Sequence, residues 1–194
     1  MEGSKELTKN TLIITIGRVS TQFITFLMLP LYTALLTTEE YGIVDLVATL
    51  VKLLIPIVSV MIDQGVFRFL LNSETDELKK KTISAAFFVL IFTSLISIVL
   101  YALVSVFVSN PYKLWLLLIL IATAFSNLFL QISRGLRQTP DSALGSFVCS
   151  ASIIVLNVLC IVFLRMGTAG MLVASFAGHV ICSIFLFVKL LYKF

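Results

Sequence analysis

The stretch DLVATLVKLLIPIVSVMIDQG, residues 45–65, has the length and apolarity of a membrane-crossing helix, but charged side chains interrupt it. Asp45 and Asp63 lie near its two ends, and Lys52 lies inside its apolar run. An ammonium group at the centre of a bilayer costs roughly 2.5–3.5 kcal/mol on insertion scales. We therefore expect these side chains to find a polar environment within the membrane.

The composition of the whole chain indicates a membrane protein. Of its 194 residues, 59% are hydrophobic and 12% are charged, and the mean hydropathy is +1.10. A soluble domain of this size could not cover so much apolar surface. Each apolar stretch is long enough to cross the hydrocarbon core as a helix. We predict an all-α membrane protein with one transmembrane domain over 1–194, whose helices cover about 11–36, 43–71, 82–108, 112–133, 142–164 and 169–188.

Basic residues outside these helices predict how the chain lies in the membrane. Lys113 and Arg165 lie on one side. The other side carries nine basic residues, namely Lys5, Lys9, Lys79, Lys80, Lys81, Arg134, Arg137, Lys189 and Lys193. Short loops rich in Lys and Arg stay in the cytoplasm. We therefore predict a multi-pass, six-helix lobe of the inner (cytoplasmic) membrane with both termini cytoplasmic.

Polar residues recur at helical spacing within the predicted spans. Steps of three and four residues place them on one face of each helix. On the span 43–71 they are Asp45, Thr49, Lys52, Pro56, Ser59 and Asp63. Arg18 and Gln22 belong to such a stripe on the span 11–36, and Asn127 belongs to one on the span 112–133. Weaker stripes on the last two spans include Ser146, Ser150, Ser175 and His179.

Polar stripes in a membrane either bond neighbouring helices together or line a hydrated cavity. For serine and threonine we expect bonds between helices, and the small pair Ala174 and Gly178 also favours close helix packing. For Arg18 and Lys52 we favour a hydrated cavity over a structural ion pair, because two cations cannot satisfy each other. Asp45 and Asp63 are also too far from Lys52 along one helix for direct pairing, which needs a spacing of three or four residues.

Other polar residues have less decisive interpretations. Arg68 either extends towards lipid phosphates or has a functional role. Asp63 caps a helix, pairs with Arg68 or binds a coupling cation. We expect His179 to be a packing residue rather than a proton carrier. The cysteines show no metal-binding spacing and are expected to be small apolar fillers, namely Cys149, Cys160 and Cys182.

The motifs of catalysis are missing from the sequence. It contains no phosphate-binding loop of the form G-x-x-x-x-G-K-[ST], no H-E-x-x-H pair and no cysteine cluster. With one histidine and ten acidic residues, an enzyme is a weak interpretation. We expect no enzymatic activity, cofactor, metal or nucleic-acid partner. A cationic cavity without catalytic groups favours recognition of an anion, with phosphate or diphosphate as the first candidate.

A family resemblance is carried mainly by the first 70 residues. The stretch LPLYTALLTTEEYGIVDL (29–46) ends one helix, turns through acidic residues and begins the next helix with YG. With GVFRFL (65–70) and QISRGLRQ (131–138), it resembles bacterial polysaccharide flippases. These are the O-antigen and capsule repeat-unit translocases of the multidrug/oligosaccharidyl-lipid/polysaccharide exporter superfamily. The likeness covers the whole chain in topology, and its specific motifs lie mainly in the N-terminal part.

The resemblance implies two six-helix lobes around a central cavity, and a substrate of undecaprenyl diphosphate carrying an oligosaccharide. It implies alternating access as the mechanism and surface polysaccharide biosynthesis as the role. Arg18 and Lys52 match, by position, cavity cations that contact the diphosphate in related lipid flippases. Gln22 and Asn127 would be their polar neighbours. Asp45, Asp63 and Arg68 remain candidates for ion coupling or pairing.

The number of helices departs from the family pattern. The family has twelve or more helices, whereas this sequence predicts six. The second lobe could come from a homodimer partner or from a C-terminal half of which this chain is the N-terminal part. Two alternatives remain open: a non-transporting membrane scaffold of a glycan-assembly complex, and a transporter similar to lipid II flippases.

Overall fold

The computed structural model describes residues 15, 26, 29–30, 32–107 and 111–192. Its described part is helical, without a strand, and residues 32–35 form the end of a first helix. Most of the predicted span 11–36 lies outside the described residues. The elements that follow are α2 (Thr38–Ser59), α3 (Ile62–Leu71), α4 (Asp76–Phe107), α5 (Lys113–Gly135), α6 (Thr139–Val158), the π-helix η1 (Leu159–Phe163) and α7 (Gly167–Leu191).

Within this described part, five stretches are long and apolar enough to cross a membrane. They are α2, α4, α5, α6 continued through η1, and α7. Their outward surface is rich in large apolar side chains, including Phe88, which is 73% exposed, and Val106, which is 79% exposed. Such a surface suits lipid rather than water. The prediction of an all-α membrane protein is confirmed.

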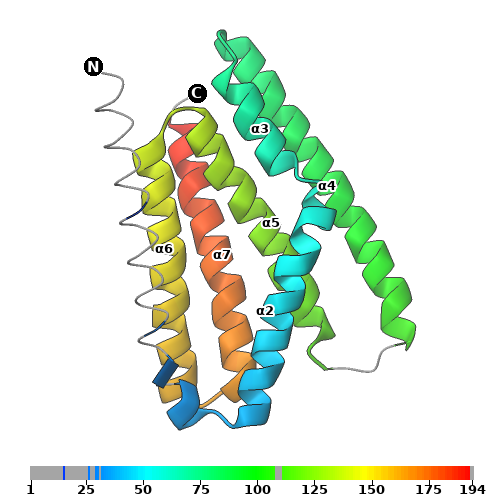
Figure 1. Cartoon of the computed structure of the whole chain (residues 1–194), viewed down its shortest axis with the longest axis vertical. Helices are drawn as coiled ribbons and strands as arrows, with labels where there is room; N and C mark the ends of the chain where they lie inside the picture. The colour runs from blue at the N-terminus through cyan, green and yellow to red at the C-terminus, as the bar shows by residue number, and fades with distance from the viewer. Residues whose placement is uncertain (1–14, 16–25, 27–28, 31, 108–110, 193–194) are drawn as a thin grey trace.

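Helix α5 forms the centre of the packing. Figure 1 shows it crossing the molecule between the α6–α7 pair on one side and α3 and α4 on the other. It contributes Leu128 and Ile132, both fully buried, to a core shared with α3 and α4. Ile119 and Leu120 join a second core with α2 and α7. Because α5 contacts every neighbouring helix, it holds α2 in a fixed position.

Small residues bring α6 and α7 close together. A Cβ on Gly178 of α7 would overlap the side chain of Ile153 and lie 3.1 Å from its backbone nitrogen. Ala174, one turn earlier, is fully buried. Gly145 of α6 likewise lies against Leu186 of α7. The predicted small-residue contact at Ala174 and Gly178 is therefore confirmed.

The beginning of α2 is fixed by a capping box. The Thr37 Oγ1 accepts a hydrogen bond from the Glu40 backbone N–H at 3.2 Å, and the Glu40 carboxylate accepts one from the Thr37 N–H at 2.8 Å. The Thr168 backbone N–H in the first turn of α7 also bonds this carboxylate. The capping box at Thr37 and Glu40, within the LTTEEYG connection, therefore also bonds the start of α2 to the start of α7.

The predicted span 43–71 is divided in two, so the expectation of one continuous helix is wrong. Val60 and Met61 both adopt left-handed backbone conformations, with φ of 48° and 51°. Ser59 Oγ accepts a hydrogen bond from the Met61 N–H at 3.1 Å and donates one to Asp63 Oδ1 at 3.4 Å. Figure 1 shows the change of direction between α2 and α3. The polar stripe therefore does not continue along one straight face to Asp63.

Most serine and threonine hydroxyls bond within their own helices, contrary to the expectation of bonds between helices. Ser146, Ser150 and Ser175 each donate to the backbone carbonyl four residues earlier, at 2.9–3.1 Å. A carbonyl one turn away is always within reach, whereas a partner on another helix requires a close approach. The hydrogen bonds of these hydroxyls are therefore made within their own helices.

The helix ends separate into two groups. In Figure 1 the α3–α4 connection, the α5–α6 connection and the end of α7 lie at one end of the molecule, and the α6–α7 connection lies at the other. The first end carries most of the described basic residues outside the spans, and the second carries Arg165. This arrangement agrees with the predicted placement of most basic residues on one side of the membrane. Which side of the membrane each end faces stays a prediction.

Candidate functional site

One face of α2 is packed and the opposite face is open. Val47, Val51 and Val58 are buried against α5 and α7. The polar stripe lies on the exposed side and comprises Asp45, Thr49, Lys52 and Pro56. The helical spacing thus placed these four residues on one face, as predicted.

Lys52 lies near the middle of the stretch from Thr38 to Leu71 and is exposed. Within the described part of the chain its ammonium group forms no ion pair with Asp45 or Asp63. An exposed cation at this depth cannot remain against acyl chains at low free energy. This face of α2 therefore requires water, an anion or another polar surface.

Pro56 adds a second polar group on the same turn. Proline has no backbone N–H, so the Lys52 carbonyl receives no bond from position 56. A carbonyl without a partner in hydrocarbon costs several kcal/mol. Because Lys52 and Pro56 are both on the exposed face, the ammonium and the freed carbonyl require the same polar surroundings.

Arg18 and Gln22 lie outside the described residues, so their predicted place beside Lys52 stays a prediction. Asn127 is half-buried on α5. No hydrogen bond joins Asn127 to Lys52 in the described part of the structure. Of the four predicted substrate-binding residues, the geometry thus places Lys52 on an open face and Asn127 within the packing around α5.

The three candidates for ion coupling or pairing lie apart. Asp45 is exposed about two turns after the start of α2, and Arg68 is exposed on α3. Asp63 is buried in the first turn of α3, where it accepts bonds from the Ser59 hydroxyl and from the Gln64 amide at 3.3 Å. Among the described residues, Asp63 and Arg68 form no ion pair. Asp63 therefore stabilises the break between α2 and α3.

His179 contributes to a contact between helices. Its Nδ1 lies 2.9 Å from Ser126 Oγ on α5 and 3.7 Å from Cys149 Sγ on α6. Cys182 donates to the Gly145 carbonyl at 3.4 Å. All three cysteines are buried, as expected of small filling residues. The prediction of a packing histidine agrees with these contacts.

An apolar groove of ≈ 450 Å³ lies on the other side of α2, between α2, α4 and α5. Leu54, Ile57 and Val58 line it from α2, and Lys52 is not among its residues. The polar lining of this groove is small, with Thr93, Ser97 and Tyr101 as its hydroxyl-bearing residues. The groove therefore does not provide the hydrated environment that Lys52 needs.

Two features of this region were missed at the level of sequence. The first is the break at Val60 and Met61, for which Pro56 and the Ser59–Asp63 spacing were available signals. The second is Arg137, which ends α5 in a left-handed conformation with φ of 60°. The sequence signal is that α5 must end before Thr139 and Pro140 begin the next helix. No glycine follows α5 to take the left-handed position that commonly ends a helix.

Comparisons with known proteins add one match to this geometry. Residues 7–194 match the family model described as Polysaccharide biosynthesis protein. Searches of curated proteins and of solved structures give no match. Since the family model covers nearly the whole chain, and the described part has the apolar helices expected of a membrane transporter, this chain belongs to the polysaccharide biosynthesis protein family.

Proposed function

We propose that this protein acts as a flippase, or as one lobe of a flippase, for undecaprenyl-diphosphate-linked oligosaccharide. It would move this substrate across the cytoplasmic membrane for the assembly of surface polysaccharide. Membership of the polysaccharide biosynthesis family supports the role in polysaccharide production and export. The lipid-linked substrate and the alternating-access mechanism are our proposal.

The observation that carries the proposal is the open polar face of α2. Lys52 offers a cation, and the Lys52 carbonyl freed by Pro56 offers an acceptor, both near the middle of a membrane span. A diphosphate entering a hydrated vestibule would bind the cation, and sugar hydroxyls could bind the acceptor. The face needs a second surface opposite it, which a second lobe or a homodimer partner would supply.

The break between α2 and α3 supports an alternating-access mechanism. Irregular backbone within a membrane helix is tolerated where it lines a cavity or lies buried in protein. Residues at such breaks absorb large backbone changes when helices move. Val60 and Met61 would therefore allow α3 to change its angle to α2 while α2 stays packed on α5.

Replacement of Lys52 tests the proposal. We expect Lys52→Ala to lower export of surface polysaccharide at least about tenfold, because a lost hydrogen bond to a charged group is worth roughly 1.5–3 kcal/mol. Lys52→Arg should keep part of the activity because it keeps the charge. The measurement is complementation of an export-deficient strain, with membrane levels of each variant determined by immunoblotting.

Lys81→Ala is the matched control, because Lys81 is an exposed lysine paired with Glu77 at 2.8 Å on the loop side of α4. It should export normally. Normal export by Lys52→Ala would reject the proposed role of the α2 face. It would favour a scaffold that binds glycan-assembly enzymes without transporting their product.

A further inference from the structure

A polar cavity lies at the end of the molecule that carries the α3–α4 and α5–α6 connections. Its volume is ≈ 220 Å³. Three elements meet there: the end of α3, the first turn of α4 and the end of α5. The lining residues are Leu70, Leu71, Ser73, Lys79, Gly135, Leu136 and Arg137. This cavity is distinct from the face of α2 and plays no part in the proposed transport.

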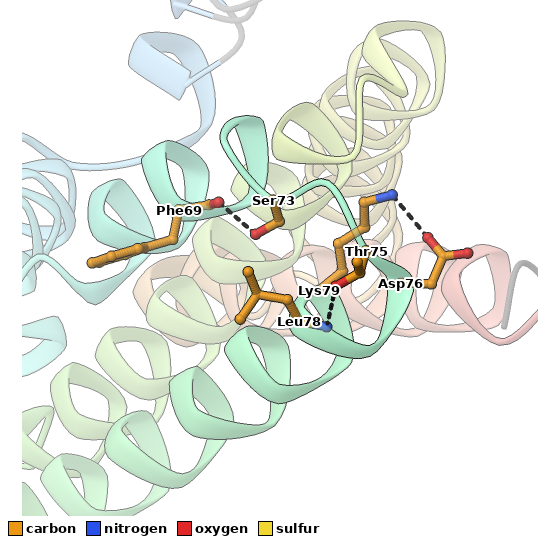
Figure 2. A network of polar contacts seen from close by, with 6 residues as sticks. All are labelled: Phe69, Ser73, Thr75, Asp76, Leu78 and Lys79. Atoms are coloured by element: carbon orange, nitrogen blue, oxygen red, sulfur yellow. Dashed lines mark hydrogen bonds and ion pairs between the residues drawn. The ribbon is translucent and has the colours of Figure 1, made fainter.

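The cavity walls are held in place by close packing. A Cβ on Gly135 would lie 2.7 Å from the Leu70 Cβ and 3.3 Å from the Phe67 carbonyl oxygen. Glycine at this position therefore allows the end of α5 to lie directly against α3. The loop above is fixed by the Ser73 hydroxyl, which donates to the Phe69 carbonyl at 2.7 Å (Figure 2).

Lys79 supplies the first cation of the cavity. Its Nζ lies 2.8 Å from Asp76 Oδ1, and the side chains are 26% and 80% exposed (Figure 2). This ion pair uses one of the three ammonium protons. The other two remain available for an anion, and the exposed Asp76 holds the lysine in position.

Arg137, an exposed arginine, also lines the cavity, and its backbone conformation is costly. The Gln138 N–H bonds the Ser133 carbonyl and the Arg137 N–H bonds the Arg134 carbonyl, each at 2.9 Å. This is a Schellman motif, in which the left-handed position is usually glycine. An arginine there costs about 1–2 kcal/mol. Residues under strain of this kind cluster at functional sites and ligand clamps.

The surroundings of the cavity combine charge with lipid-facing apolar side chains. Leu71 is 38% exposed and Phe69 is 69% exposed, and both lie on α3 beside the cavity. In Figure 2 the Phe69 ring points away from the polar network. Basic pockets between transmembrane helices at the headgroup level bind anionic lipids. A ligand with a phosphate and apolar chains would match both parts of this region.

We propose that this cavity binds the phosphate of an anionic glycerophospholipid. Lys79 and Arg137 hold the phosphate, and the acyl chains lie along the apolar surface of α3. The bound lipid joins the ends of α3, α4 and α5. This binding is independent of the transport function proposed above.

Native mass spectrometry of the full chain, equilibrated with equal amounts of phosphatidylglycerol and phosphatidylcholine, tests the proposal. We expect the wild type to retain phosphatidylglycerol in preference. Arg137→Gly should reduce this preference about tenfold, because it removes a charged donor. The same variant relieves backbone strain, so loss of binding through misfolding is not expected. Lys79→Gln should weaken binding in the same direction.

Arg165→Gly is the matched control, because Arg165 is also a left-handed arginine, with φ of 50°, at the opposite end of the molecule. It should keep the wild-type preference. Equal preference in the wild type and Arg137→Gly, or equal loss in both glycine variants, would overturn the proposal. Displacement of phosphatidylglycerol by inorganic phosphate alone would also overturn it, because the cavity would then bind a soluble anion. Displacement by farnesyl diphosphate would overturn it too, because the cavity would then bind the transported lipid.

Discussion

Lys52 and Pro56 form one chemical unit on a single turn of α2. The lysine carries a charge on the exposed face, and the proline removes the donor that would satisfy the lysine carbonyl. Together they place a donor and an acceptor at the same depth, which is the property a headgroup site needs.

Thr37 is a residue whose effect on stability can be isolated. Its hydroxyl caps α2, and its backbone N–H completes the capping box with Glu40. We expect Thr37→Ala to lower the free energy of unfolding by about 1 kcal/mol, since the cap is lost while the helix interior is unchanged. Chemical denaturation in detergent, followed by circular dichroism, measures this loss.

Thr38→Ala is its control, because Thr38 is exposed at the first helical position of α2 and does not cap the helix. It should leave the free energy of unfolding within about 0.5 kcal/mol of the wild type. If both variants lose the same amount, the capping box does not stabilise α2 in the way described.

At the scale of elements, the division of α2 from α3 is the least regular part of the fold. Pro56 weakens the last turns of α2, and the left-handed Val60 and Met61 end it. A β-branched residue such as valine rarely adopts this conformation. The contacts of Ser59 with Met61 and Asp63 hold the break in one arrangement, while α2 and α3 each keep their own packing on α5.

Pro56→Ala tests whether this irregularity serves transport. It restores a backbone donor to the Lys52 carbonyl and removes a helix-breaking ring, so α2 should gain about 1–3 kcal/mol of stability. The same change should reduce export, because the Lys52 carbonyl is no longer available as an acceptor. Thermal unfolding in detergent and the export assay give the two values.

Pro140→Ala is the corresponding control. Pro140 lies in the first turn of α6, where the missing N–H would have no helical partner. Both stability and export should stay near wild type. Unchanged export by Pro56→Ala, with the expected gain in stability, would contradict a role for Pro56 in transport.

The helices themselves were largely predictable, and their irregularities were not. Long apolar runs specify spans such as α5, whose observed bounds are within two residues of the predicted 112–133. Helix α4 begins at Asp76, earlier than predicted, because acidic residues in the first turn and the Lys79 and Lys81 pairs favour helix in a charged segment.

The break at Val60 could not be read from hydropathy, because the residues on both sides are equally apolar. The candidate site was predicted in part. Spacing alone placed Lys52 and its neighbours on one face of α2. Spacing could not show that serine hydroxyls such as Ser150 bond within their own helices, since that choice depends on the distance to neighbouring helices. The left-handed conformation of Arg137 was also missed, because no glycine marks that position after the end of α5.

At the scale of the whole molecule, the described lobe has two kinds of outer surface. Most of it is apolar and suited to lipid, as on α4, where Phe88 and Phe92 are exposed. The exposed side of α2 differs, because the polar stripe around Lys52 lies there beside the exposed Leu53 and Ile57. A membrane protein can keep such a face where it borders a hydrated cavity, and this border is the central claim of the proposed mechanism.

Cysteine accessibility measures that border directly. In a background with Cys149, Cys160 and Cys182 replaced by alanine, Lys52→Cys and Phe88→Cys are each treated in intact membranes with a charged, membrane-impermeant maleimide. Only a thiol in contact with water forms the reactive thiolate. We expect rapid labelling at position 52 and none at position 88. Failure to label position 52, with the protein present in the membrane at normal levels, would contradict the hydrated cavity.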